Sequence, residues 1–290
     1  MNLKKMTVYQ SAGNNESVPI MVEEWSFDRE KKELTTFNRN SEIVRQSIFQ
    51  YDKKGRLVAL EENFPIEKMT NLSKIEYRDE ERQKIERAFY QDGSNSKTVT
   101  TYWNEGGKIL KIEKYEEETS TVPIEVQTFV YDNFGNLVNK KTMDENEIVI
   151  DSKTWTYDGE HLLIRYDSVQ DGAENQFQFE YDEKGILKKQ ISLMNEALTD
   201  TLEITYDAAE GTRTEFSTNQ NSESFERKYN KQDLLISEER KTLRSENRYK
   251  TAKLFITYNE DGLIQSETSL DDFNTDNCYQ NRYEYEYYPE

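Results

Sequence analysis

The chain offers few side chains for catalysis. Its 290 residues include one histidine, His161, and one cysteine, Cys278. A cysteine–histidine nucleophile pair would have to form from residues far apart in sequence, and a zinc site needs several such ligands. The Gly-x-Ser-x-Gly turn of hydrolases is absent, and Gly106-Gly107-Lys108 lacks the spacing of a phosphate loop. We therefore expect no enzyme activity and no cofactor, and we interpret His161 as a solvated turn residue.

One acidic segment near the C-terminus is similar to the start of a calcium loop. Asp272, Asn274 and Asp276 stand at the first three ligand positions of such a loop. The sixth position is Asn277 rather than glycine, and the twelfth is Tyr283 rather than glutamate. A polar hairpin turn accounts for the segment better, so we assign no metal, and calcium binding stays an open alternative.

Aromatic side chains are the remaining candidates for binding. The chain contains 19 Tyr, 13 Phe and 3 Trp, and an exposed row of rings could stack on a sugar or cover a protein partner. The alternative is that these rings pack against neighbouring elements. The predicted binding stripe consists of Trp25, Tyr51, Trp103, Tyr131, Trp155 and Tyr181.

The aromatic residues recur at a nearly constant interval. A fixed period of this size indicates an array of one repeated supersecondary unit, here about 11 units of about 26 residues. Successive copies lie 23 to 29 residues apart when anchored on Phe27, Tyr51, Tyr77, Tyr102, Tyr131, Tyr157, Tyr181, Tyr206, Tyr229, Tyr258 and Tyr285.

Each unit is predicted to be a β-hairpin. In the segment Tyr51–Leu57, Asp52 can accept a bond from the backbone two residues on, and Gly55 tolerates a positive φ. This predicts a type I turn with a glycine bulge between antiparallel strands. The leucine six residues after the tyrosine should lie across from the aromatic side chains.

The residues before each tyrosine alternate between apolar and polar, as in strands with one wet face. Thr100 and Arg227 break this alternation at the apolar site. The charged segment 79–89 is in phase with the hairpins, so we interpret it as turn and strand.

The resulting fold class is all-β. We predict about 22 strands in one antiparallel meander over residues 1–290, as a single domain. Because 34% of the residues are hydrophobic and 33% are charged, a sandwich with a fully apolar inner face is disfavoured. A single-layer sheet, curved or spiralling through strand twist, is expected instead.

The segments 51–57, 131–137 and 181–187 share the pattern Tyr-Asp-x-x-Gly-x-Leu. This pattern resembles the YD repeats of Rhs and teneurin-type proteins, over nearly the whole chain. Large members form a β-shell around a toxin domain and end in a self-cleaving segment built on Asp-Pro-x-Gly-Leu. No proline here follows aspartate, so the resemblance implies a free-standing, degenerate relative without a toxin cage. In plan, the chain is also similar to single-layer repeat antitoxins.

The net charge of the chain favours some classes of binding partner over others. With 38 basic and 57 acidic residues, the net charge is −19. Nucleic acid is disfavoured as a ligand, because neutralising phosphates requires clustered lysine and arginine. An acidic surface attracts basic proteins instead, although acidity could serve solubility alone. The end strands, Thr7–Gln10 and Tyr283–Tyr287, are predicted to be free sheet edges, the latter guarded by charge, which favours a monomer.

The compartment follows from what the sequence lacks. Residues 1–8 open with basic residues but carry no apolar run behind them, and no apolar stretch could span a membrane. A single cysteine excludes internal disulfides. We expect a cytoplasmic protein, or an extracytoplasmic one if a leader has been removed.

Two functional hypotheses follow. The first is a non-enzymatic immunity protein or antitoxin that binds a secreted bacterial toxin, with another protein, a basic toxin domain, as partner. The second is a structural or cell-surface module that acts as a spacer, adhesin or carbohydrate binder.

Overall fold

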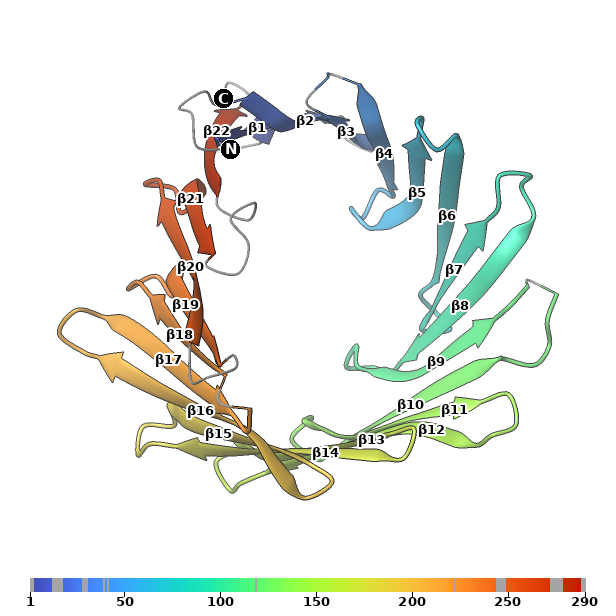
Figure 1. The fold of residues 1–290 in the computed structure, drawn as a ribbon. Coiled ribbons are helices and arrows are strands. Elements are labelled where there is room, and N and C mark those ends of the chain that lie inside the picture. Colours follow the sequence, from blue (N-terminus) through green and yellow to red (C-terminus); the bar gives the residue numbers. More distant parts are fainter. Residues whose placement is uncertain are drawn as a thin grey trace. The chain divides into compact units, whose positions relative to one another are not determined.

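The computed structural model describes residues 3–11, 18–27, 31–38, 40, 42–117, 119–221, 223–243, 249–271 and 279–287. These residues form 22 strands joined by turns. No helix occurs among them, so none could cross a membrane. The predicted all-β fold is confirmed: the strands pair with their chain neighbours in a single-layer antiparallel meander (Figure 1).

Contacts between residues divide the chain into two units, described here one at a time. The first comprises Met1–Thr7, Ile20–Thr154 and Tyr285–Glu290, and the second Val8–Pro19 and Trp155–Glu284. The divisions fall inside β1 (Leu3–Ser11), β2 (Val18–Phe27), β12 (Val149–Tyr157) and β22 (Tyr279–Tyr287). Domain boundaries usually fall in linkers, whereas arrays of repeats make contacts only between neighbours. One domain over 1–290 therefore stays a prediction.

The first unit pairs β2 through β12 in chain order. The charged segment 79–89 is a turn followed by a strand, as predicted. Between β2 and β12 lie β3 (Lys31–Asn38), β4 (Ile43–Tyr51), β5 (Leu57–Phe64), β6 (Met69–Arg78), β7 (Gln83–Phe89), β8 (Asn95–Trp103), β9 (Ile109–Tyr115), β10 (Glu125–Tyr131) and β11 (Leu137–Asp144).

The second unit pairs β13 through β22 in the same way. Its strands before β22 are β13 (Leu163–Gln170), β14 (Ala173–Tyr181), β15 (Leu187–Met194), β16 (Ala197–Asp207), β17 (Thr212–Asn219), β18 (Ser224–Tyr229), β19 (Leu235–Leu243), β20 (Tyr249–Tyr258) and β21 (Ile264–Asp271).

The Tyr-Asp turns have the predicted geometry. Asp52 Oδ1 accepts hydrogen bonds from the backbone N–H groups of Lys54 at 2.8 Å and Arg56 at 2.9 Å, and Gly55 has a φ of 75°. The register places Tyr51 across from Leu57. The turns after Tyr131 and Tyr181 repeat this arrangement.

Two of the turns that follow a repeat tyrosine close without glycine at the bulge. His161 and Asp233 adopt φ values of 66° and 61° at that position. His161 is exposed, which agrees with its interpretation as a solvated turn residue. The repeat therefore keeps its turn geometry even where the preferred residue is missing.

In one repeat, the aromatic residue that precedes the turn is Trp103 rather than the predicted Tyr102. Asn104 Oδ1 accepts the N–H of Lys108 at 3.0 Å, Gly107 has a φ of 77°, and Trp103 lies across from Ile109. Trp103 thus takes the tyrosine position, and the assignment of Thr100 to the apolar site is wrong. Two adjacent aromatic residues left the anchor ambiguous, and the turn hydrogen bonds select the second.

The sheet has no thick apolar core. Among the described residues, the buried hydrophobic side chains are Val8, Leu34, Ile85 and Ile204. Small polar side chains are also buried: Ser47 is 1% exposed and lies across from Leu34 on one neighbouring strand and Glu62 on the other. A single layer has no second sheet to cover it, so burial comes from lateral packing.

The predicted free edges are wrong. β1 pairs with both β2 and β22, and the Arg282 guanidinium lies 5.1 Å from the ring centroid of Tyr9. A pairing between the two ends of a chain leaves no local signal in the sequence, because each strand carries only its own alternation. The curvature of the sheet and the monomeric state stay predictions.

Candidate functional site

The predicted tyrosines hold the repeats together. The Tyr131 hydroxyl donates to the Ile109 carbonyl at 2.9 Å, and the Tyr181 hydroxyl donates to the Leu163 carbonyl at 2.8 Å. Tyr258 does the same to Leu235 at 2.9 Å. Each bond reaches the strand that follows the preceding Tyr-Asp turn. Burial raises the pKa of Tyr131, Tyr181 and Tyr258, so all three hydroxyls stay protonated donors at neutral pH.

Replacing Tyr181 by phenylalanine tests this role. We expect the free energy of unfolding to fall by about 1 kcal/mol, because the half-buried Leu163 carbonyl loses its donor while the ring stays in place. Urea denaturation followed by tryptophan fluorescence measures the change. Tyr90→Phe is the matched control, since that ring is 62% exposed. An equal loss at both positions would contradict the proposed bond.

The other predicted stripe residues belong to separate hairpins. The Trp155 ring lies 5.3 Å from the Tyr166 ring, which lies 5.6 Å from Phe177. Tyr51 and Trp103 are half-buried across from Leu57 and Ile109. The backbone of Trp25 pairs with Leu34, and its side chain lies outside the described residues. These contacts support packing between hairpins, and a binding stripe stays a prediction.

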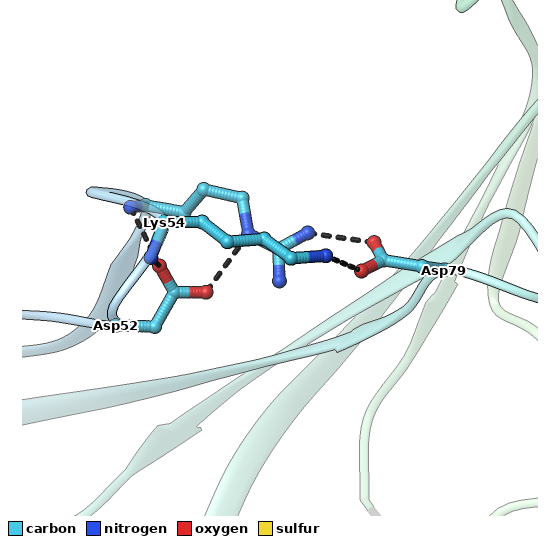
Figure 2. A network of polar contacts seen from close by, with 4 residues as sticks. Asp52, Lys54 and Asp79 are labelled. Atoms are coloured by element: carbon cyan, nitrogen blue, oxygen red, sulfur yellow. Dashed lines mark hydrogen bonds and ion pairs between the residues drawn. The ribbon is translucent and has the colours of Figure 1, made fainter.

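Ion pairs link the successive turns that follow the repeat aromatic residues, here called the Tyr-Asp turns even where the aspartate is replaced. Figure 2 shows Asp52, Lys54 and Asp79 in a network of polar contacts that joins two successive turns. Arg56 contacts Asp52 at 2.9 Å and Asp79 at 2.6 Å, and Lys54 contacts Asp79 at 2.7 Å. The Arg56 guanidinium also lies 4.0 Å from the Tyr77 ring centroid.

These carboxylates are held in the ionised form. The backbone N–H of Arg56 lowers the pKa of Asp52, and hydrogen bonds from Lys54 and Arg56 lower the pKa of Asp79. The next turns continue the links, since Arg82 contacts Glu105 at 2.6 Å and Lys108 donates to the Gly135 carbonyl. At this end of the strands, many charges are satisfied within the protein.

A charged row crosses the second unit at Arg227, which stands where most other repeats have an apolar residue. The register aligns Ile204, Glu215, Arg227, Glu238 and Leu254 on neighbouring strands. Glu215 and Glu238 are only 9% and 8% exposed. Arg227 Nε donates to Glu238 at 2.5 Å. We call these three charged residues the ion row.

The ion row is fully partnered. Arg213 pairs with Glu215, whose other oxygen accepts the Tyr229 hydroxyl at 2.9 Å, and Arg240 also donates to Glu238. Burial alone would raise the pKa of Glu238, but the hydrogen bonds from Arg227 and Arg240 outweigh it and lower that pKa. Glu238 therefore stays ionised near neutral pH. This suits a structural role rather than proton transfer.

The opposite ends of the strands are different. In the first unit, we use the name connector edge for four successive connectors, made of residues 65–68, 90–94, 116–117 with 119–124, and 145–148. Lys68 is the one basic residue in these described connectors. The acidic residues are Glu67, Asp92, Glu116, Glu117, Glu145 and Glu147. None of them forms an ion pair with a lysine or arginine of the described chain, so their charge faces solvent.

Large apolar side chains are exposed at the same edge. Tyr90, Val122 and Ile148 are 62%, 61% and 60% exposed. Ile66, Met69, Ile124, Val149 and Ile150 add to this surface. Single exposed apolar residues are ordinary, whereas a group of them at one edge indicates an interaction surface.

The apolar surface of the connector edge was not predicted from the sequence, because it lies in turns, where polar residues are the rule. The available signal was the run Ile148–Ile150, in which three consecutive aliphatic residues break the strand alternation. Among the described residues, no cluster of histidine, cysteine and acidic side chains could hold a metal. Asp272, Asn274 and Asp276 lie outside the described residues.

No established protein family and no curated protein matches the sequence. Among solved structures, a porin-like protein from Bacteroides uniformis is 11% identical with a TM-score of 0.36, over 98% of both chains. TcdB2-TccC3 without its hypervariable C-terminal region is 14% identical with a TM-score of 0.42, over 90% of this chain and 16% of that chain. Likenesses this weak concern the arrangement of strands and carry no functional argument.

Proposed function

We propose that the protein is a non-enzymatic binding protein that holds a basic protein partner at the connector edge of its first unit. Most concretely, it is an immunity protein or antitoxin that neutralises a secreted bacterial toxin by direct contact in the cytoplasm. One observation carries this proposal: unpaired carboxylates and exposed apolar side chains occur together at that edge.

The contrast between the two ends of the strands supports this assignment. Asp52, Asp79 and Glu105 at the Tyr-Asp turns have cationic partners within the protein. Glu145 and Glu147 in the connectors have none among the described residues. Carboxylates without internal partners are available to a partner's lysine and arginine, and desolvated apolar contacts supply affinity.

The net charge of −19 favours the same class of partner. A negative field raises the rate at which basic proteins arrive and repels acidic ones. Basic nuclease domains are one such class of toxin. We further propose that the chain is a degenerate YD repeat, because the Asp-x-x-Gly turn geometry recurs after Tyr51, Tyr131 and Tyr181.

The test uses the protein encoded by the gene immediately upstream. We expect co-expression to give a stable complex in size-exclusion chromatography with light scattering, and to restore growth if the upstream product is toxic. Glu145→Lys with Glu147→Lys should weaken binding about tenfold or more, because two attractive contacts become repulsive.

The control places the same charge change at the other end of the strands. Glu183→Lys with Glu260→Lys alters two exposed carboxylates in Tyr-Asp turns, and it should leave affinity nearly unchanged apart from the net charge. Equal losses for both double variants would place binding elsewhere. Absence of any complex would overturn the immunity role.

A further inference from the structure

Two neighbouring connectors of the first unit border an open, shallow hollow. Its volume is about 860 Å³, and its lining includes Met69, Leu72, Phe89 and Tyr90. The Gln91 side chain donates to the Lys68 carbonyl at 2.7 Å, which ties the two connectors together. The hollow is therefore a fixed feature of the connector edge, in which a group of apolar side chains lies among polar ones.

Acidic groups border these apolar side chains. Glu67 and Asp92 belong to the same hollow, which also contains Lys68, so two carboxylates face one ammonium group there. The hydroxyl of Ser94 lowers the pKa of Asp92, so that carboxylate stays charged at neutral pH. Apolar side chains with carboxylates beside them suit a partner side chain that combines an aliphatic stem with a cationic head, as lysine and arginine do.

The next two connectors repeat this combination. Val122 and Ile124 lie close in sequence to Glu116 and Glu117, and Ile148 follows Glu147. Strands β10 and β11 pair Glu125 with Asp144, which brings these two connectors side by side. Connectors at one end of a meander are two strands apart, so the four from residue 65 to residue 148 span roughly 29 Å.

From this arrangement we infer that the connector edge receives a basic amphipathic helix of the partner. This inference rests on the proposed function and names the partner's contact segment. A helix of about 19 residues covers roughly 29 Å. Its aliphatic side chains fill the hollow and cover Val122 and Ile148, and its lysines and arginines meet the flanking carboxylates.

The charges argue against the two other occupants of an exposed apolar edge. Anionic lipid headgroups would be repelled by Glu116, Glu117, Glu145 and Glu147. A second copy of the chain brings its own net charge of −19, so like charges would meet unless the copies were arranged to avoid it. A basic segment alone gains from both the apolar and the acidic groups.

The experiment uses three synthetic peptides of 18 residues at 150 mM salt. The first is an amphipathic helix of leucine and lysine, the second is polylysine, and the third replaces each lysine of the first by glutamate. Fluorescence anisotropy should show binding of the first peptide, at least tenfold weaker binding of polylysine, and none of the third. Equal binding of the first two would show that charge alone acts, which overturns the inference.

Variants then locate the contact. Tyr90→Ser with Ile148→Ser should reduce affinity for the leucine–lysine peptide at least tenfold. Phe216→Ser in the second unit is the control, since that ring is 43% exposed away from the connectors. Thermal denaturation verifies that each variant is folded.

The two proposals fail separately. If the upstream protein binds and Glu145→Lys with Glu147→Lys weakens it, but the leucine–lysine peptide does not bind, the proposed function stands and the helix inference is wrong. If the peptide binds at the connector edge but no upstream protein does, the surface is correct and the immunity role is wrong.

Discussion

Replacing Arg227 by isoleucine is expected to lower the free energy of unfolding by about 2 kcal/mol. Removing one partner of a buried ion pair usually costs about 3–5 kcal/mol, because a charge is left without compensation. The loss should be smaller here, since the Arg227 side chain is 31% exposed and Glu238 keeps Arg240. Urea denaturation at neutral pH measures the change.

The ion row should be replaceable as a whole. Combining Glu215→Leu, Arg227→Ile and Glu238→Leu is expected to recover part of the stability lost by the single variant, because Arg213 keeps Asp233 while the Tyr229 hydroxyl loses its acceptor Glu215. The flanking residues Ile204 and Leu254 are already apolar, and replacing a buried ionic group by well-packed apolar residues is often neutral or stabilising. If the triple variant had a lower free energy of unfolding than Arg227→Ile, the two glutamates would stabilise the fold beyond neutralising the charge of Arg227.

The pH dependence gives a second readout of this prediction. The folded state lowers the pKa of Glu238, so its contribution to stability is complete above the unfolded pKa of about 4.3. It is lost as the pH falls through the lower folded pKa. The stability advantage of the wild type over Arg227→Ile should therefore shrink below about pH 4. An advantage that stays constant into that range would contradict an ionic origin.

Local signals explain how much of the fold the sequence predicts. The Asp52 and Gly55 turn chemistry acts within a few residues, so the hairpins and their number are readable from the chain. The pairing of β1 with β22 is not, because neither strand carries a mark of its distant partner. The repeat at Trp103 is intermediate between these two cases. Its turn is readable from the sequence, but only the turn hydrogen bonds show that Trp103, and not Tyr102, precedes it.

The candidate site also contains residues that the sequence reveals and residues that it does not. Tyr131 and Tyr181 are conspicuous in sequence because each hairpin needs one, and periodic residues in a repeat are therefore structural first. The residues of the connector edge, such as Tyr90, Val122 and Ile148, follow no period. Their grouping depends on the meander bringing alternate turns to one end, which only the assembled strands display.

Arg227 illustrates the value of a broken rule. Its position two residues before Tyr229 is apolar in most other copies, and the register confirms the alignment because Tyr229 lies across from Leu235. The exception marks the ion row, where Glu215 and Glu238 on the adjacent strands supply the missing compensation. A departure from a repeat is thus a better pointer to special chemistry than the repeat itself.

The bulge glycines should be the most sensitive turn positions. Gly185 has a φ of +75°, and a Cβ there would lie 3.5 Å from Leu162 Cδ1 of the preceding turn. We expect Gly185→Val to lower the free energy of unfolding by about 3 kcal/mol, because a β-branched residue resists a positive φ and its methyl groups would crowd Leu162. Gly185→Ala should cost about 1 kcal/mol, since it adds no branch.

Gly107→Val is the comparison variant for Gly185→Val. Gly107 has a φ of +77° with nothing within 4 Å of an added Cβ, and Gly106 beside it can accept the positive φ after a one-residue shift of the turn. The loss at Gly107 should therefore be clearly smaller than at Gly185, and Gly106→Val alone should change stability little. Urea denaturation of the three valine variants tests this order. Equal losses at Gly185 and Gly107 would mean that neither contact with the preceding turn nor a shift of the positive φ to Gly106 affects stability, and that each hairpin turn is stabilised on its own rather than by its neighbour.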